Sequence, residues 1–294
     1  MDWIQLTQRA GVACHDLVGW VLFDPTAQAN YGRLGISDGR GYTVACRTAS
    51  LGDVEPAVAA AACYSIHPDV IGFVIGLYRG VADGEAIMQA RDDAVLPGLN
   101  AVDPELPDRL APLAEPLWTA VDSLFAGARP MFAAHQARTR PADLDAALSA
   151  WLAVNCLREY RGDNHWALCA GEGLEPVDVG LLHTAMVSAD EYEPEWIARS
   201  RGAGDDDVAS AWHRLESRGF ASRGALTDAG RQFRHELETR TDALTAPAWQ
   251  ALGEDLTIEL LGIVEPMHDA FVARIDATAG PKWMPAVRGP SHSS

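Results

Sequence analysis

The sequence predicts an all-α fold, mainly helical, with a small winged-helix β-hairpin near the C-terminus. Apolar residues recur at helical spacing along almost the whole chain, whereas the alternation typical of strands is nearly absent. The exception is FASRGAL, Phe220 to Leu226, where two short strands can form about a turn between two helices. With 294 residues, 48% of them hydrophobic, the chain can form a sizeable core.

Proline and glycine divide the first part of the chain into short helices. Trp3 to Phe23 is predicted to form one or two helices that end at Asp24-Pro25. Pro56 to Tyr64 is predicted to form another, which ends at His67-Pro68. The Gly-rich segment SDGRGYT between these helices is expected to be a turn.

The next segments differ in composition. Asp69 to Tyr78 is almost wholly apolar and is expected in the interior, whereas Gly84 to Leu96 has the mixed composition of a surface helix. Pro97 to Pro116 contains five prolines, which predicts a connector wrapped on the surface. A helix over Leu117 to Phe125 follows. We expect a helical ligand-pocket domain over residues 1–190, a winged-helix-like domain over 191–262, a C-terminal helix over 263–279 and a flexible tail over 280–294.

One long helix is predicted over Leu144 to Cys169. Its apolar stripe begins with residues spaced three and four apart, which fixes the phase of the helix: Leu144, Ala147, Leu148, Trp151 and Leu152. At 100° per residue the stripe continues through polar positions and two aromatic or sulfur positions: Asn155, Arg158, Glu159, Gly162, Trp166 and Cys169. His165 lies at its margin, and Arg161 lies about 60° away from it. Polar groups are therefore expected where the pattern calls for apolar ones.

Two interpretations of this stripe remain open. In the first, Arg158 and Glu159 pair with neighbouring helices, His165 is hydrogen-bonded in the core, and the network only fixes helix register. In the second, the stripe is the wall of a pocket. Arg158 then binds an anion, and Glu159 and His165 are the catalytic residues that accept and exchange protons. Gly162 would allow the close approach of a ligand or helix.

Further polar and aromatic residues are candidates for ligand binding beside Arg158. Those on the long helix are Arg161, Gly162, Asp163 and Trp166, and those that would form an opposite wall are His15, Tyr31, Arg47, Tyr64 and His67. Each residue alone has a simpler interpretation as a cap or a core residue. The sequence does not show that they converge.

The C-terminal third contains a recognisable module. Val208, Ala211, Trp212 and Leu215 form the stripe of a helix that ends at Arg218-Gly219. The FASRGAL hairpin follows, and Thr227 caps a long helix with Phe233, Leu237 and Leu244 on its stripe. The phrase WHRLESRGF...ALTDAGRQF resembles the end of a MarR-type winged helix. The resemblance implies a recognition helix, a wing and a following helix.

The whole chain also resembles an actinobacterial family of helical proteins described as helix-turn-helix. Six residues match its R-E-x-R-G-D-x-H phrase: Arg158, Glu159, Arg161, Gly162, Asp163 and His165. The resemblance implies DNA binding and assigns no catalytic roles. The charges argue against that partner: the net charge is -18, and from Asp205 to Arg218 four acids accompany two arginines, whereas DNA binding relies on cations that neutralise phosphates. We therefore expect DNA not to be a partner.

Other classes of protein are excluded by what the sequence lacks. The only lysine is Lys282, which excludes a phosphate-loop lysine and a pyridoxal Schiff base. No local spacing fits a zinc, calcium or dinucleotide motif, so we expect neither metal nor cofactor. The longest apolar run, Val70 to Tyr78, is too short for a bilayer, and the five cysteines form no C-x-x-C pair. These features predict a cytoplasmic protein without membrane contact.

We rank three hypotheses for function. The first is a cytoplasmic small-molecule-binding protein for an anionic or aromatic metabolite, with metal-independent acid/base catalysis left open and the winged helix used for packing or as a homodimer surface. The second is a ligand-responsive MarR-like transcription regulator. The third is a structural or interaction partner without a small ligand.

Overall fold

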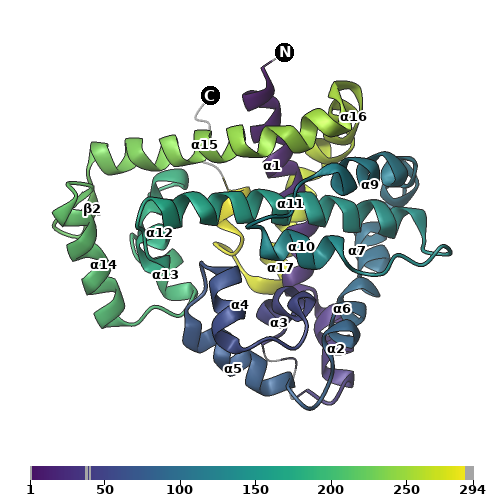
Figure 1. Cartoon of the computed structure of the whole chain (residues 1–294), viewed down its shortest axis with the longest axis horizontal. Coiled ribbons are helices and arrows are strands. Elements are labelled where there is room, and N and C mark those ends of the chain that lie inside the picture. The colour runs from purple at the N-terminus through teal and green to yellow at the C-terminus, as the bar shows by residue number, and fades with distance from the viewer. Residues whose placement is uncertain (1, 37–38, 40, 289–294) are drawn as a thin grey trace.

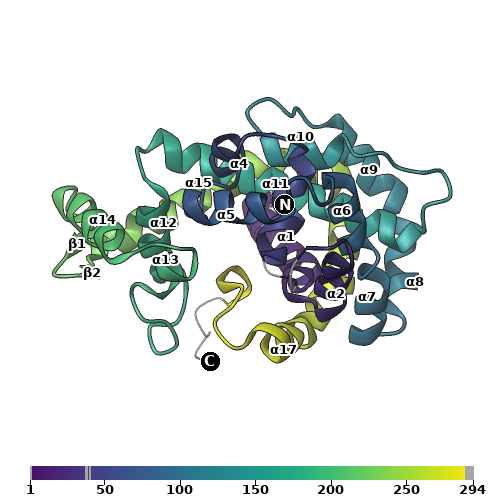
Figure 2. The same cartoon turned by 90° about the horizontal axis from the view of Figure 1, so that it is seen from below.

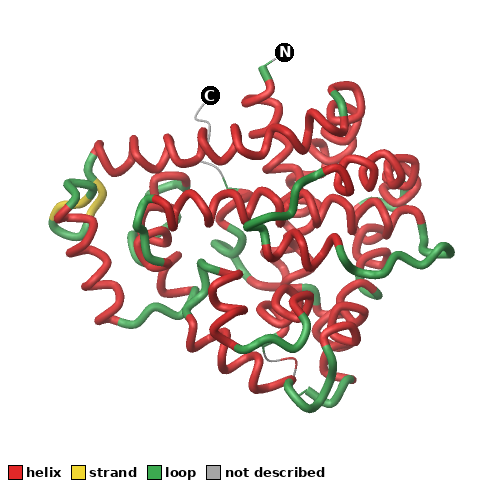
Figure 3. Tube along the Cα trace, viewed as in Figure 1, coloured by secondary structure: helices red, strands yellow, loops and turns green. Residues whose placement is uncertain are grey.

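The computed structural model describes residues 2–36, 39 and 41–288. Within them the fold is helical apart from one antiparallel pair of short strands, β1 (Ala221–Ser222) and β2 (Ala225–Leu226), as Figure 3 shows. The all-α prediction with a hairpin near the C-terminus is confirmed. The predicted SDGRGYT turn falls partly outside the described residues, at positions 37, 38 and 40.

The first half of the chain forms short helices, where η marks a 3-10 helix. They are α1 (Trp3–Gly19), η1 (Trp20–Phe23), α2 (Pro25–Arg33), α3 (Tyr42–Thr48), η3 (Ala49–Leu51), α4 (Pro56–Cys63), α5 (Pro68–Tyr78), α6 (Gly84–Asp92), α7 (Val95–Val102), α8 (Leu106–Leu110), η4 (Ala111–Leu113), α9 (Ala114–Ser123) and α10 (Pro130–Gln136). The first helices end at Asp24-Pro25 as predicted, and Asp24 also caps the next helix, α2, where its side chain accepts the amide of Ala27.

The expectation of a surface connector over Pro97 to Pro116 is wrong. The segment forms most of α7, all of α8 and the start of α9, and Leu99, Leu106 and Leu110 are buried. Prolines lie in the first turns of α8 and η4, where the missing amide has no helical partner to lose. Proline here marks helix starts. Similarly, α5 is only half interior, because its Phe73 side chain is 62% exposed.

The second half is built on two long helices. Its elements are α11 (Ala146–Gly171), α12 (Pro176–Leu182), η5 (His183–Met186), α13 (Trp196–Ser200), α14 (Asp205–Ser217), the hairpin, α15 (Asp228–Leu252), α16 (Glu254–Val264), η6 (Glu265–Met267), α17 (His268–Ala279) and η7 (Pro285–Val287). The helix predicted over Leu144 to Cys169 is thus confirmed as α11. It crosses the centre of the molecule, and α15 runs beside it (Figure 1).

The described residues form two main hydrophobic cores. The larger core includes Trp20, Trp151 and Trp249 and is surrounded by α1 to α11, α16 and α17. The smaller core includes Val208, Trp212 and Leu237 and holds α12, α13, α14, the hairpin and the first part of α15 together. Both long helices run from one core into the other. The smaller unit projects from the body, as Figure 2 shows.

The C-terminal segment returns to the larger core. Met284 and Val287 are buried there, and the Tyr192 hydroxyl donates to the carbonyl of Lys282 at 2.9 Å. The segment predicted to be a flexible tail is therefore packed as far as residue 288, while residues 289–294 lie outside the described residues. The proposed division of the chain into four parts stays a prediction.

Two helical glycines should respond in opposite ways to alanine. In Gly230→Ala the new Cβ would lie 2.1 Å from the carbonyl oxygen of Phe220, a backbone atom that cannot move freely, so the smaller core should lose stability. In Gly162→Ala the nearest atoms lie at 3.8 Å, so the change should stabilise α11 by up to about 1 kcal/mol. Thermal unfolding of the two variants measures the difference. A gain in Gly230→Ala would contradict the packing described here.

Candidate functional site

A layer of polar side chains lies between the two hydrophobic cores. On α11 the larger core ends at Tyr160 and the smaller one includes Cys169, and four polar residues lie between them: Arg161, Asp163, Asn164 and His165. On α15 the corresponding gap lies between Leu237 and Ala248, and it holds polar side chains that are buried or nearly so: Glu238, Thr241, Asp242 and Thr245. We call these residues, together with Arg158 and Glu159 of α11 and the side chains that pair with any of them, the polar layer.

The first part of the polar layer centres on Glu159. Its carboxylate accepts from Arg47 of α3 at 3.2 Å and from the adjacent Arg158. Burial raises the pKa of Glu159, but the charges of Arg47 and Arg158 outweigh burial and the pKa lies at about 2. Arg158 also donates to Nδ1 of His15 at 3.3 Å, and the pKa of His15 is well below its usual value because of burial and the nearby arginines. Glu159 therefore acts as a charged counter-ion at neutral pH.

The second part joins α11 to α15. Arg161 donates to Glu238 and, at 3.0 Å, to Asp242, so it is anchored as firmly as Arg158, although its helical phase placed it off the stripe. Glu238 also accepts from Arg234 at 2.6 Å. Burial raises the pKa of Glu238, yet Arg161 and Arg234 hold it well below its usual value. Burial raises the pKa of Asp242 to about 6 despite Arg161.

His165 occupies the middle of the polar layer. Its Nδ1 lies 3.0 Å from the Thr241 hydroxyl, which itself donates to the carbonyl of Leu237. The hydroxyl hydrogen is thus used, so Nδ1 of His165 donates and Nε2 faces the Cys169 thiol at 3.7 Å. Burial and the charge of Arg234 lower the pKa of His165 to about 3. A group with this pKa stays neutral near pH 7, which disfavours the acid/base role predicted from the sequence.

Asp163 and Asn164 attach α11 to the start of α10. Asp163 accepts the amide of Phe132 at 2.9 Å, and Asn164 accepts from Arg129 at 2.8 Å. Burial raises the pKa of Asp163 to about 7, against the lowering effect of the Phe132 amide. This carboxyl is consequently only partly charged at neutral pH.

The remaining predicted residues are spread over the molecule. The Trp166 and Tyr64 rings stack with centroids 5.6 Å apart, next to the polar layer. Tyr31 is buried against Tyr42 in the larger core. His67 lies at the start of α5, facing the turn before α14. Gly162 meets no close neighbour, so the tight approach expected at this glycine is absent among the described residues.

Sequence reasoning missed the α15 side of the polar layer. Arg234, Glu238 and Asp242 follow one another at intervals of four, so they lie on one face of α15. The signal that could have identified them is that these charged residues share a helix face with Leu237 and Thr241, which are buried, so the face turns inward. His183 and Arg201 carried no comparable pattern, since they lie in short elements and turns.

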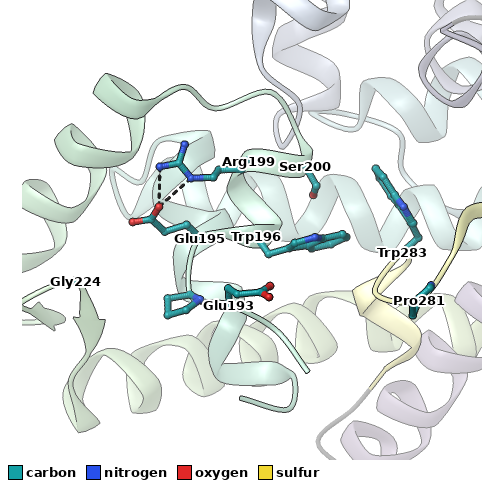
Figure 4. A pocket seen from close by; sticks show the side chains of 9 residues that line it. Glu193, Glu195, Trp196, Arg199, Ser200, Gly224, Pro281 and Trp283 are labelled. Carbon is teal, nitrogen blue, oxygen red and sulfur yellow. Dashed lines mark hydrogen bonds and ion pairs between the residues drawn. The ribbon is translucent and has the colours of Figure 1, made fainter. Parts of the chain in front are cut away.

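A cleft of about 730 Å³ opens elsewhere, between α13 and the C-terminal segment (Figure 4). The rings of Trp196 and Trp283 meet edge to face there, with centroids 5.5 Å apart. None of the residues predicted to bind a ligand borders this cleft. Its walls are formed by Glu193, Pro194, Glu195, Trp196, Arg199, Ser200, Gly224, Pro281 and Trp283.

The smaller core presents a helix, turn, helix and hairpin in sequence. α13 is followed by the turn over residues 201–204, then by α14 and the two strands. On α14 Val208, Ala211, Trp212 and Leu215 are buried, as predicted, and the opposite face is exposed. That face carries Asp206, Ala209, Ser210, His213, Glu216 and Ser217. The arrangement matches a helix-turn-helix motif in which the outer face of the second helix is exposed.

Comparison with known proteins agrees with this geometry. Residues 7–278 match a family described as a helix-turn-helix family. The chain belongs to this family. No curated protein and no solved structure matches the chain.

Membership of the helix-turn-helix family corrects one expectation. The expectation that DNA is not a partner is wrong, because the match to a family with this DNA-binding motif covers almost the whole chain. Counting charges misled us, since some of the acids near α14 are engaged by the protein itself. Asp205 pairs with Arg199 at 2.8 Å, and Asp207 accepts the amide of Gly204 at 2.8 Å.

No helix among the described residues is both long and apolar enough to cross a membrane. Within the same residues, histidine, cysteine and carboxylate side chains form no group of three or more that fits a metal ion.

Asp163→Asn should change how stability depends on pH. An unfolded aspartate titrates near pH 3.9, whereas the folded pKa is about 7, so the folded state holds an extra proton between these values. The protonated carboxyl contributes its full stability below about pH 4. Between about pH 4 and 7 this contribution falls by about 1.4 kcal/mol per pH unit, and it is lost once the pH has risen through 7. Asparagine can accept the Phe132 amide and stays neutral, so urea unfolding between about pH 5 and 8 should show a smaller loss in the variant.

Asp143→Asn provides the control for this experiment, because Asp143 is exposed. It should follow the wild-type pH profile. If Asp163→Asn follows it as well, the Asp163 carboxyl is already ionised at neutral pH and the description of its surroundings is incorrect.

Proposed function

We propose that the protein is a ligand-responsive, DNA-binding transcription regulator in which α14 contacts base edges and the hairpin contacts the phosphate backbone of the DNA. The placement of α14 carries this proposal. Its apolar face packs in the smaller core, and its polar face lies at the edge of the projecting unit (Figures 1 and 2). The order of helix, hairpin and long helix is also similar to the end of a MarR-type winged helix.

The exposed face of α14 offers hydrogen-bonding groups for base edges. Ser210, His213 and Ser217 recur at intervals of three and four, so they lie on one side of the helix. A major groove admits one helix, and side chains on one face of that helix reach successive base pairs. These three residues are therefore the proposed base-reading set.

Phosphate contacts fall to the arginines of the hairpin and its flanks. Arg223 lies at the turn between the strands with φ of 53°, and its backbone amide is held by Glu216 at 2.7 Å, which fixes where the side chain emerges. Arg218 and Arg231 flank the hairpin and are exposed, and the partner of Arg231, Asp228, is itself fully exposed. Arg214 does not belong to this set because the buried carboxylate of Asp178 holds its guanidinium.

The proposed response to a ligand rests on the polar layer. α15 begins directly after the hairpin, and its Glu238 and Asp242 hold Arg161 of α11. A small molecule that alters these ion pairs would move α15 and with it the base of the hairpin. In this proposal Arg158, Glu159 and His165 keep the polar layer, where the ligand would bind, in its folded arrangement. A homodimer, in which two copies would contact two half-sites, stays a prediction that light scattering tests.

Arg223→Ala should weaken DNA binding about equally for all sequences and should reduce the slope of log K against log salt by about 1. His213→Ala should instead reduce the preference for the selected sequence, because it removes a proposed base contact. Fluorescence anisotropy with a duplex enriched by in vitro selection, titrated at several salt concentrations, measures both effects.

Arg33→Ala is the matched control, since Arg33 is an exposed arginine in α2, far from the hairpin (Figure 1). It should leave affinity and slope unchanged. Failure to enrich any duplex by selection, or an equal loss in all three variants, would contradict DNA reading by α14.

A further inference from the structure

Arg201 differs from the other arginines near the polar layer. It follows α13 and begins the turn that leads to α14. Burial lowers its pKa to about 10, helped by the charges of Arg47 and Arg234, and no carboxylate among the described residues raises it. Arg201 is half-buried, and partial removal of its guanidinium from water without a carboxylate nearby costs free energy. An anionic group would remove this cost.

Neighbouring donors also lack acceptors. Arg234 donates to Nδ1 of His183 at 3.4 Å, so the proton of neutral His183 is on Nε2. This Nε2 is buried without a hydrogen-bond partner among the described residues, and so are the Nε atoms of Arg234 and Arg47. All of these atoms are donors. The surroundings of Arg201 therefore provide an excess of N–H groups.

The charges of the polar layer are unbalanced in the same sense. Five arginines accompany three carboxylates: Arg47, Arg158, Arg161, Arg201 and Arg234 against Glu159, Glu238 and Asp242. Asp163 adds at most one negative charge, and Arg129 beside Asn164 adds one positive charge. A chain with a net charge of -18 thus has about two excess positive charges in this layer. A phosphate group carries about -1.5 to -2 near pH 7 and matches this excess better than a single carboxylate.

A hollow reaches Arg201 from the junction of the two units. Its cavity volume is about 10 Å³, which is close to the minimum that holds one water molecule. A larger group such as a phosphate can enter only if the walls of the hollow move apart. Its walls are Ser65, His67, Pro176, Val177, Ala198, Arg201 and Ala203.

We propose that Arg201, with Arg47, Arg234 and His183, forms a binding site for a phosphate group, either free or carried by a small metabolite. Guanidinium groups and imidazole N–H groups are strong donors to phosphate oxygens. The site takes its cations from three elements far apart in the sequence: α3, the turn before α14, and α15. The group is thus held where both units meet.

The turn that contains Arg201 is also the turn of the helix-turn-helix motif. The Arg201 carbonyl accepts the His67 amide at 2.9 Å, and a Cβ on Gly202 would lie 2.5 Å from Val70, so this turn is seated tightly on the start of α5. His67 also faces Asp207 in the first turn of α14 at 3.6 Å. Phosphate binding would remove the repulsion among the arginines and fix the position of α14. Only this effect on α14 rests on the proposed function, because the binding site stands without it.

Thermal unfolding with inorganic phosphate tests the site. Wild-type protein dialysed free of phosphate should melt about 4 °C or more higher at a phosphate concentration near 100 times Kd than in sodium chloride of equal ionic strength. Arg201→Gln should lose this shift. Without phosphate the variant should melt no lower than wild type, because an uncompensated charge has been removed. Glycerol phosphate distinguishes a metabolite-borne group from free phosphate, and both count as support.

Arg199→Gln is the matched control, since Arg199 lies two residues away but is exposed and pairs with Glu195 and Asp205. It should keep the full phosphate shift, and circular dichroism should show both variants folded. A wild-type shift no larger than in chloride, an equal shift with acetate, or a full shift in Arg201→Gln would overturn the proposal.

DNA binding provides a separate readout. Phosphate should change DNA affinity in the wild type and not in Arg201→Gln. If no DNA binds while the phosphate shift depends on Arg201, the proposed regulator function fails and the site stands. If DNA binds while phosphate causes no shift, the site fails and the regulator function stands.

Discussion

Two hydrophobic cores meet along α11 and α15 at a layer of charged side chains, and most of these charges are held by ion pairs within α11, within α15 and between elements. Arg161 can reach both Glu238 and Asp242 only when α11 and α15 have one relative register, since the two acids lie one turn apart. A shift by one turn would leave a charge without its partner, at a cost of several kcal/mol. The ion pairs therefore fix how the helix-turn-helix unit sits on the body.

The sequence predicted α11 and the burial of its polar residues because both follow from helical phase alone. The helical phase of α11 does not identify the partners of its charged residues, since Arg47 and Glu238 come from helices far away in the chain. It also underestimated Arg161, whose long side chain extends from a position off the stripe to the acids of α15. The Pro97 to Pro116 segment failed for another reason: proline was taken as a break, although it also starts helices.

The charge argument about DNA failed because formal charges ignore where side chains are engaged. Asp205 and Asp207 at the start of α14 interact with Arg199 and with the Gly204 amide, which also suits the positive end of a helix. The net charge of the whole chain is similarly uninformative, because dissolved salt screens the hairpin from acids on distant surfaces. The order of helix, hairpin and long helix in the C-terminal third, which resembled a helix-turn-helix family, gave the better guide.

An excess of positive charge at the turn of a helix-turn-helix motif has a thermodynamic consequence. A ligand shifts an equilibrium only by its difference in affinity for the two states, and in the proposed site a phosphate group would gain most from Arg47, Arg201 and Arg234 together. It therefore stabilises the arrangement of α14 described here against any arrangement in which the three arginines separate. Linkage makes this effect reciprocal, so DNA that selects the same arrangement of α14 must tighten phosphate binding by the same factor, and DNA that selects another must weaken it.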